Sequence, residues 1–192
     1  MIGLLLLPLL AFTPTKWQLE KEEDGIKVYL GNANDTKFKQ FKVEAFVDAK
    51  PHDIARAVVD LENNYKWFNN VKKAKLIKQV SNNEFLFKQV IEVPFPFKNR
   101  ETVQRCRIDL RKDGTARIDL DDENTAAPAD DEYVRMPMAV GYWNLTHKNG
   151  GTWVEYSFLT DPGGNIPAWL ANEFIVDSPF KTIKNLRAYL KN

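Results

Sequence analysis

The chain has a single cysteine and only two histidines among its 192 residues. One cysteine allows no intramolecular disulfide and excludes CxxC-type metal or redox motifs. A zinc site needs several nitrogen or sulfur ligands, and Cys106, His52 and His147 together barely supply three. The sequence also contains no GxSxG, P-loop or GxGxxG pattern. We therefore expect no metal site, no cofactor and no catalytic residues.

Neither sign of charge is in excess, because 27 Lys and Arg face 26 Asp and Glu. A net charge of +1 creates no field that would attract nucleic acid. The short basic run Lys72, Lys73 and Lys75 has no aromatic residues spaced along it and is interpreted as a solvated strand edge. The acidic segment from Asp119 to Glu132 lacks the spacing and fixed glycine of an EF-hand, so it is interpreted as a solvated loop. Nucleic acid is therefore not an expected partner.

Only one long apolar run is present, from Met1 to Phe12. It is shorter than the roughly 20 residues that a helix needs to cross a bilayer. The run is typical of the apolar region of a secretory signal, although no Lys or Arg precedes it. We predict a signal peptide over residues 1–14, one domain over residues 15–192 and, in a bacterium, an exported periplasmic or secreted protein. The alternative is a cytoplasmic protein whose N-terminus forms an apolar strand or helix.

The rest of the chain is dominated by strand patterns. Alternating apolar and polar residues predict half-buried antiparallel strands, and Asp24-Gly25 and Asp113-Gly114 predict tight hairpin turns. The strands are predicted at residues 17–21, 26–30, 37–47, 72–79, 84–93, 100–110, 115–120, 138–147 and 152–160.

Two helices are predicted beside these strands. One begins at Pro51, which the first helical turn tolerates, and apolar residues recur at helical spacing over residues 54–65. The other covers residues 166–190 and should kink or restart near Ser178, because Pro179 lies inside it. Runs of strands separated from helices indicate an α+β fold with helices on one face of an antiparallel sheet. Whether side chains or a ligand fill the gap between helix and sheet decides the function.

Three segments of the sequence resemble the START (StAR-related lipid-transfer) domain of the SRPBCC or helix-grip superfamily. Residues 93–101, VPFPFKNRE, resemble its Pro-and-aromatic loop that ends in an Arg–acid pair. Residues 65–71, YKWFNNV, resemble the segment after the helix that carries a Trp before the next strand. Residues 161–190 resemble the closing helix and are the most specific part. The resemblance covers roughly residues 17–192 and implies a helix-grip fold, with a curved antiparallel sheet wrapped around a long C-terminal helix.

The resemblance also implies a function. We expect a monomer that binds a lipid or other hydrophobic small molecule in an enclosed cavity between the sheet and the C-terminal helix, and transfer of this ligand through transient contact with a membrane is a further expectation. Some START domains carry a buried acid–base pair in the tunnel. Here Gln89 lies on the acid's strand and Cys106 stands where the base is expected, which implies a more neutral cavity. Sterols, phospholipids, fatty acids, carotenoids and quinones all remain open as ligands.

The candidate ligand-binding residues lie on the strands, on the Pro-rich loop and at the start of the long helix. They are Phe87, Gln89, Phe95, Phe97, Cys106, Tyr156, Phe158, Trp169 and Phe174. Each aromatic residue has the alternative of packing in the core, and Cys106 has that of an inert buried thiol.

Two alternatives to a lipid carrier remain. One is a cyclase or aromatase-like enzyme acting on an apolar substrate through a carboxylate or arginine in the pocket. The other is an interaction protein whose cavity is filled by side chains. The charged residues Glu101, Arg105, Arg107 and Arg117 are explained by cross-strand pairing on the solvent face of the sheet.

Overall fold

The computed structural model describes residues 16–33, 36 and 38–191, apart from the side chains of residues 168, 169, 172 and 173. The predicted signal peptide therefore lies outside the described residues. The described strands are β1 (Trp17–Glu23), β2 (Ile26–Asn32), β3 (Lys39–Val47), β4 (Val71–Ser81), β5 (Glu84–Ile91), β6 (Arg100–Leu110), β7 (Ala116–Asp122), β8 (Val134–Arg135), β9 (Met138–Lys148) and β10 (Gly151–Asp161). The helices are α1 (Pro51–Val59) and α2 (Ala168–Tyr189), with short 3-10 turns η1 (Asn64–Lys66) and η2 (Asn124–Ala126).

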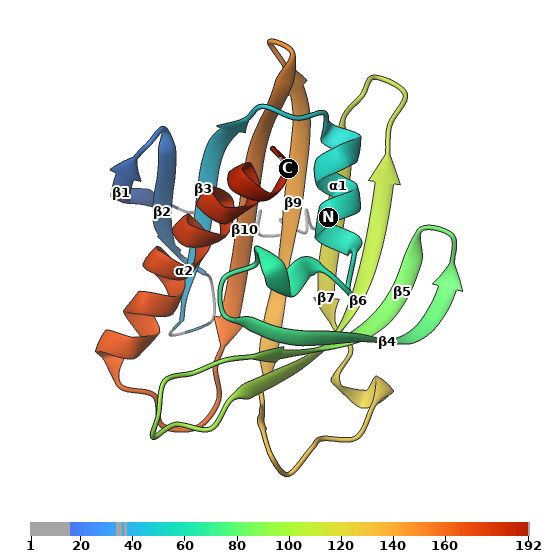
Figure 1. Cartoon of the computed structure of the whole chain (residues 1–192). Coiled ribbons are helices and arrows are strands. Elements are labelled where there is room, and N and C mark those ends of the chain that lie inside the picture. Colours follow the sequence, from blue (N-terminus) through green and yellow to red (C-terminus); the bar gives the residue numbers. More distant parts are fainter. Residues whose placement is uncertain (1–15, 34–35, 37, 192) are drawn as a thin grey trace, which may run out of the picture.

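One sheet contains all these strands, in the order β1-β2-β3-β10-β9-β7-β6-β5-β4. Neighbours along this path pair antiparallel, and the short β8 pairs parallel with β6. Figure 1 shows that the sheet curves strongly and that both helices lie on its concave side. Helix α2 packs on β2 and β3, whereas α1 packs on β7 and β9. The predicted α+β architecture, a curved antiparallel sheet wrapped around a long C-terminal helix, is confirmed.

The helices differ from the sequence prediction at two points. Helix α1 ends at Val59, and the chain then forms η1, so that Tyr65 is half exposed instead of lying on the apolar face of α1. Helix α2 continues through Pro179, so the predicted restart near Ser178 is wrong, whereas the alternative of a kink there stays a prediction. Pro179 is buried, and packing against the sheet supplies most of the stability of such a helix. No helix among the described residues is long and apolar enough to cross a membrane.

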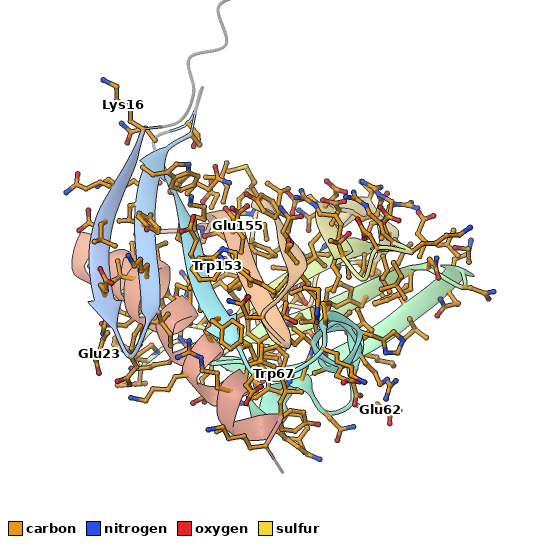
Figure 2. The ribbon with its side chains drawn as sticks, turned by 90° about the horizontal axis from the view of Figure 1, so that it is seen from above. Lys16, Glu23, Glu62, Trp67, Trp153 and Glu155 are labelled. Carbon is orange, nitrogen blue, oxygen red and sulfur yellow. The ribbon has the colours of Figure 1, made fainter. Side chains whose placement is uncertain are left out.

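Tryptophan side chains fill one half of the space between α2 and the sheet. Trp67 and Trp143 are fully buried and meet edge to face, with ring centroids 6.2 Å apart. Figure 2 shows Trp67 near α2 and α1, while Trp153 and Glu155 lie on the outer face of the sheet. Asn185 on α2 donates a hydrogen bond to the Trp67 carbonyl over 3.1 Å, which ties the helix to the turn before β4. This half of the gap is therefore packed core.

Candidate functional site

The other half of the gap contains a cavity of about 320 Å³. Helix α2 contributes Ala171, Phe174, Ile175 and Ser178 to its wall. The opposite wall consists of the inward-facing residues of β3, β5, β6, β9 and β10. This volume lies at the lower end of the range of roughly 300–1,000 Å³ that holds drug-sized ligands. The gap between helix and sheet is thus filled by side chains in one half and open in the other.

Aromatic rings form the boundary between the packed half and the cavity. Tyr156 stacks on Trp143 with a centroid distance of 4.0 Å, and it meets Phe41 edge to face at 5.1 Å. Burial raises the pKa of the Tyr156 phenol, so this side chain stays neutral at all ordinary pH values. The Phe158 ring lies over Gly141 of the neighbouring strand, where a Cβ atom would come within 2.3 Å of the ring. Gly141 therefore leaves the space that this ring occupies beside the cavity.

A stripe of uncharged polar side chains crosses the sheet side of the cavity. Thr102 and Gln104 are buried on β6, and Gln89 lies opposite Thr102 in the register of β5 and β6. The Gln104 amide donates a hydrogen bond to the Ala139 carbonyl over 2.6 Å, which fixes its orientation. Among the lining residues that the structure describes, none is a carboxylate or a histidine. The stripe can hydrogen-bond a neutral polar group, and it offers no acid–base pair.

Arg100 precedes this stripe on the same face of β6. It is 4% exposed and lines the cavity. Its guanidinium donates hydrogen bonds to the carbonyls of Lys98, Pro162 and Gly163. Burial lowers the pKa of Arg100 because the charged form loses hydration. Arg100 therefore joins the loop that precedes β6 to the loop that precedes α2.

Two rim loops border the cavity, residues 92–99 and residues 162–167. Val93 and Arg100 flank the tip of the first rim loop, and both line the cavity, as do Pro162 and Ile166 in the second. Phe95 lies at the tip of the first loop and is 96% exposed. A fully exposed aromatic ring beside an apolar cavity is available for contact with another apolar surface.

The nine candidate residues from the sequence do not all line the cavity; some lie in the first rim loop or in the packed core. The cavity is lined by four of them, Gln89, Tyr156, Phe158 and Phe174. Phe95 projects from the rim loop and Phe97 is half-buried in it, while the side chain of Trp169 lies outside the described residues.

Phe87 and Cys106 are not lining residues and belong to the packed core instead. Phe85, with its ring 5.8 Å from that of Phe87, fills this end of the concave face. Burial, and then the charge of Asp119, raise the pKa of the Cys106 thiol to about 12, so it stays protonated and unreactive at neutral pH.

Sequence reasoning did not single out several cavity residues that the structure brings together. They are Phe41, Phe68, Arg100, Thr102, Gln104 and Ile175. The three β6 residues could have been found from the sequence, because the alternation of a strand places positions 100, 102 and 104 together on the inner face of the sheet.

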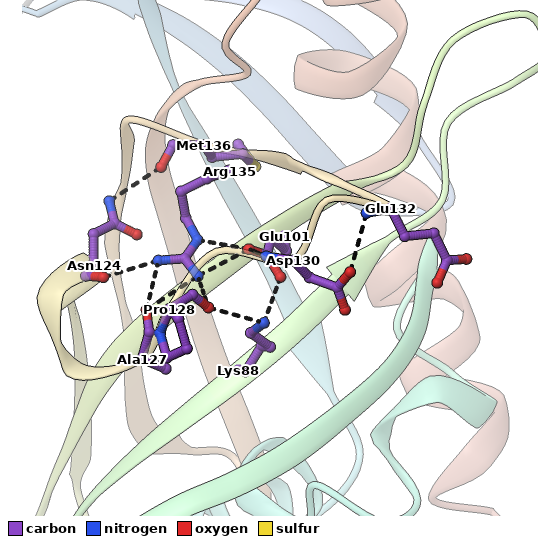
Figure 3. A network of polar contacts seen from close by, with 9 residues as sticks. All are labelled: Lys88, Glu101, Asn124, Ala127, Pro128, Asp130, Glu132, Arg135 and Met136. Atoms are coloured by element: carbon purple, nitrogen blue, oxygen red, sulfur yellow. Dashed lines mark hydrogen bonds and ion pairs between the residues drawn. The ribbon is translucent and has the colours of Figure 1, made fainter.

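The outer face of β6 carries a buried charge network, shown in Figure 3. Glu101 was expected on the solvent face, but its side chain is 0% exposed because the segment from η2 to β8 covers it. One Glu101 oxygen accepts hydrogen bonds from the Asp130 N–H at 3.0 Å and from Arg135 at 2.9 Å, and Lys88 lies 2.6 Å from the other oxygen.

Of the remaining three charged residues, Arg105 and Arg107 pair with acids outside their own strand, as predicted from the sequence, whereas the ion pair of Arg117 lies within β7. Arg105 pairs with Glu84 and Glu123, while Arg107 pairs with Asp121 and Arg117 with Asp119. Among the described residues no group of His, Cys, Asp or Glu is arranged to hold a metal ion.

Comparison with known proteins gives a consistent family assignment. The family model of the START domain matches residues 7–192. An uncharacterised protein of Pseudomonas aeruginosa is 35% identical over 90% of this chain and 85% of its own length. The phosphatidylcholine transfer protein of Rattus norvegicus is 29% identical over 84% of this chain and 78% of its own length.

One solved structure is similar to this chain in both fold and sequence. It is a fragment of the STAR-related lipid transfer protein of Xanthomonas axonopodis. That fragment is 31% identical to this chain, with a TM-score of 0.83 over 92% of this chain and 99% of its own.

Proposed function

Because the chain belongs to the START domain family, we propose that it binds a lipid or other hydrophobic small molecule in the cavity beside α2 and carries it without covalent chemistry. The observation behind the proposal is the cavity of about 320 Å³ between α2 and the sheet, bounded by Phe41, Tyr156 and Phe158. The rat and Xanthomonas relatives are both named as lipid transfer proteins.

The physical requirement for such a carrier is enclosure of apolar surface. Shielding one methylene from water is worth about 0.8 kcal/mol, so a 16-carbon chain is held in a membrane by roughly 12–13 kcal/mol. A carrier must offset most of this free energy, and scattered surface contacts cannot do so. A cavity bounded by aromatic and aliphatic side chains supplies burial of the required kind.

The two alternatives are less well supported. A cyclase needs a general acid or base near the substrate. The described lining residues include no carboxylate and no histidine, and the guanidinium of the lining residue Arg100 is held by three backbone carbonyls. An interaction protein with a filled cavity would show side chains throughout the gap, whereas a cavity of about 320 Å³ remains beside the packed Trp67 and Trp143.

Native mass spectrometry of protein purified without detergent, followed by lipid extraction, tests the proposal. We expect a monomer that carries one apolar molecule, with the extract identifying its class. Protein that is free of ligand, and that stays free after incubation with mixed liposomes, would contradict it.

We also propose that the first rim loop contacts the donor membrane through Phe95. Burying one Phe side chain is worth about 1.5–3 kcal/mol, so Phe95→Ala should slow lipid extraction from liposomes on the order of tenfold or more. The thermal midpoint and the affinity for a water-soluble amphiphile should not change, because this ring is 96% exposed.

The matched control is Leu110→Ala, which removes another exposed apolar side chain at the opposite end of β6. Extraction rates measured by fluorescence transfer from labelled vesicles should be unaffected by this control. Equal rates for Phe95→Ala and the wild type would show that the tip of the loop does not touch the membrane.

A further inference from the structure

The charged side chains that line the cavity have one sign. Among the described lining residues, Lys39 and Arg100 carry charge, and both are cations. Lys39 is exposed at the start of β3, whereas Arg100 is 4% exposed. A buried cation is costly unless it is paired with an anion. In the described part of the chain, no carboxylate forms an ion pair with Arg100.

Arginines on the outer face of the sheet near Arg100 differ from it, because they form ion pairs with carboxylates. Arg105 on β6 forms ion pairs with Glu84 and Glu123, and Arg135 on β8 pairs with Glu101. The charges of these arginines are compensated although their side chains are more exposed than that of Arg100. The chain thus provides counter-ions on the outer face of β6, while the cation on the cavity face lacks one among the described residues.

The three carbonyls around Arg100 satisfy only part of its hydrogen-bonding capacity. A guanidinium has five N–H donors, and the carbonyls of Lys98, Pro162 and Gly163 take three of them. Carbonyl oxygens orient the group and supply dipoles, but they carry no net negative charge. Among the described residues, the other two N–H donors and the positive charge of Arg100 have no partner, so they are available to a ligand.

We propose that the ligand is a single-chain amphiphile with an anionic oxygen headgroup, a carboxylate or a phosphate monoester, and that this headgroup binds Arg100. Planar guanidinium groups bind such oxyanions through paired hydrogen bonds. Thr102, Gln104 and Gln89 lie next along the cavity wall and hydrogen-bond any neutral oxygens near the head. The chain then extends toward Tyr156 and Phe158.

The size of the cavity beside α2 fits one chain, and a second hollow of about 470 Å³ adjoins it at the rim loop of residues 162–167. About 320 Å³ is the volume of a small drug-sized site. A phospholipid with two long acyl chains is much larger than a drug-sized molecule. The inference rests on the proposed function, because it assigns the ligand class of that same cavity.

The test compares ligands that share a chain and differ in the head. Dodecanoate, dodecyl phosphate and 1-dodecanol are titrated below their aggregation concentrations into the wild type, Arg100→Gln and Arg100→Lys, and binding is measured calorimetrically. We expect the wild type to prefer an anion over the alcohol on the order of tenfold to hundredfold, the range of a charge-assisted hydrogen bond. Which of the two anions binds more tightly distinguishes a carboxylate from a phosphate ligand.

The ratio of the affinities for the anion and for the alcohol shows whether Arg100 recognises the headgroup or only has a structural role. Arg100→Gln should bring the anion-to-alcohol ratio close to one, Arg100→Lys should retain part of it, and the control Arg105→Gln should leave it unchanged. If Arg100 only ties the rim loops together, Arg100→Gln lowers both affinities equally, and that result overturns the inference. A wild type that binds all three amphiphiles alike overturns the inference alone, whereas one that binds none overturns the proposed function as well.

Discussion

Replacing Ala171 with Phe is expected to abolish lipid binding while leaving the fold intact. Ala171 lies on α2 and its side chain lines the cavity. An engineered cavity of about 150 Å³ holds one benzene molecule, so a phenyl ring at this position would occupy nearly half of the 320 Å³. The cavity would then be too small for a lipid chain.

The expected loss is at least tenfold in the amount of lipid that co-purifies with the protein, measured by mass spectrometry. The thermal midpoint should change by only about 2 °C or less, because filling a void avoids most of the cost of overpacking, and the helix propensities of Ala and Phe differ by only about 0.5 kcal/mol. Ala171→Ser is the matched control, since it changes the same position without filling the space. Full lipid content in Ala171→Phe would place the ligand outside this cavity.

Strand positions were largely predictable because strand burial follows a period of two. The prediction for β6, residues 100–110, matches the structure without correction. The turns at Asp24-Gly25 and Asp113-Gly114 were predictable too, since the glycines there have positive φ values of 65° and 84°. The two-residue strand β8 was missed, because two residues are too few to show a period.

The cavity itself could not be predicted, because it depends on which inward-facing rings meet. Trp67 and Trp143 are far apart in sequence and touch only when the sheet curves and α2 closes over it. Alternation shows that Phe87 and Phe158 face inward, yet it does not show that Phe87 packs in the core while Phe158 lines the cavity. The burial of Glu101 on the outer face of β6 could not be predicted either, because the segment that covers this side chain lies more than twenty residues further along the chain.

The largest loss of stability is expected from Glu101→Gln. The carboxylate is fully buried and forms ion pairs with both Lys88 and Arg135, which lie 2.6 and 2.8 Å away. Removing one member of a buried ion pair costs roughly 3–5 kcal/mol, because the remaining charges stay poorly hydrated. In a domain of this size the loss should lower the thermal midpoint on the order of 10 °C, measured by circular dichroism. Glu84→Gln makes the same change in the less buried pair with Arg105 and should cost about 1 kcal/mol or less.

The pH dependence identifies the charge as the cause of that loss. Burial by itself would raise the pKa of Glu101, but Lys88, the Asp130 N–H and Arg135 outweigh burial and hold the pKa below its ordinary value of 4.5. A carboxyl whose pKa is lower in the folded state contributes its full stabilisation above its unfolded pKa and loses it as the pH falls through the folded pKa. The difference in unfolding free energy between wild type and Glu101→Gln should therefore be constant near pH 7 and shrink below about pH 4.5. A difference that stays the same down to pH 3 would mean that Glu101 stabilises β6 through packing and hydrogen bonds rather than through its charge.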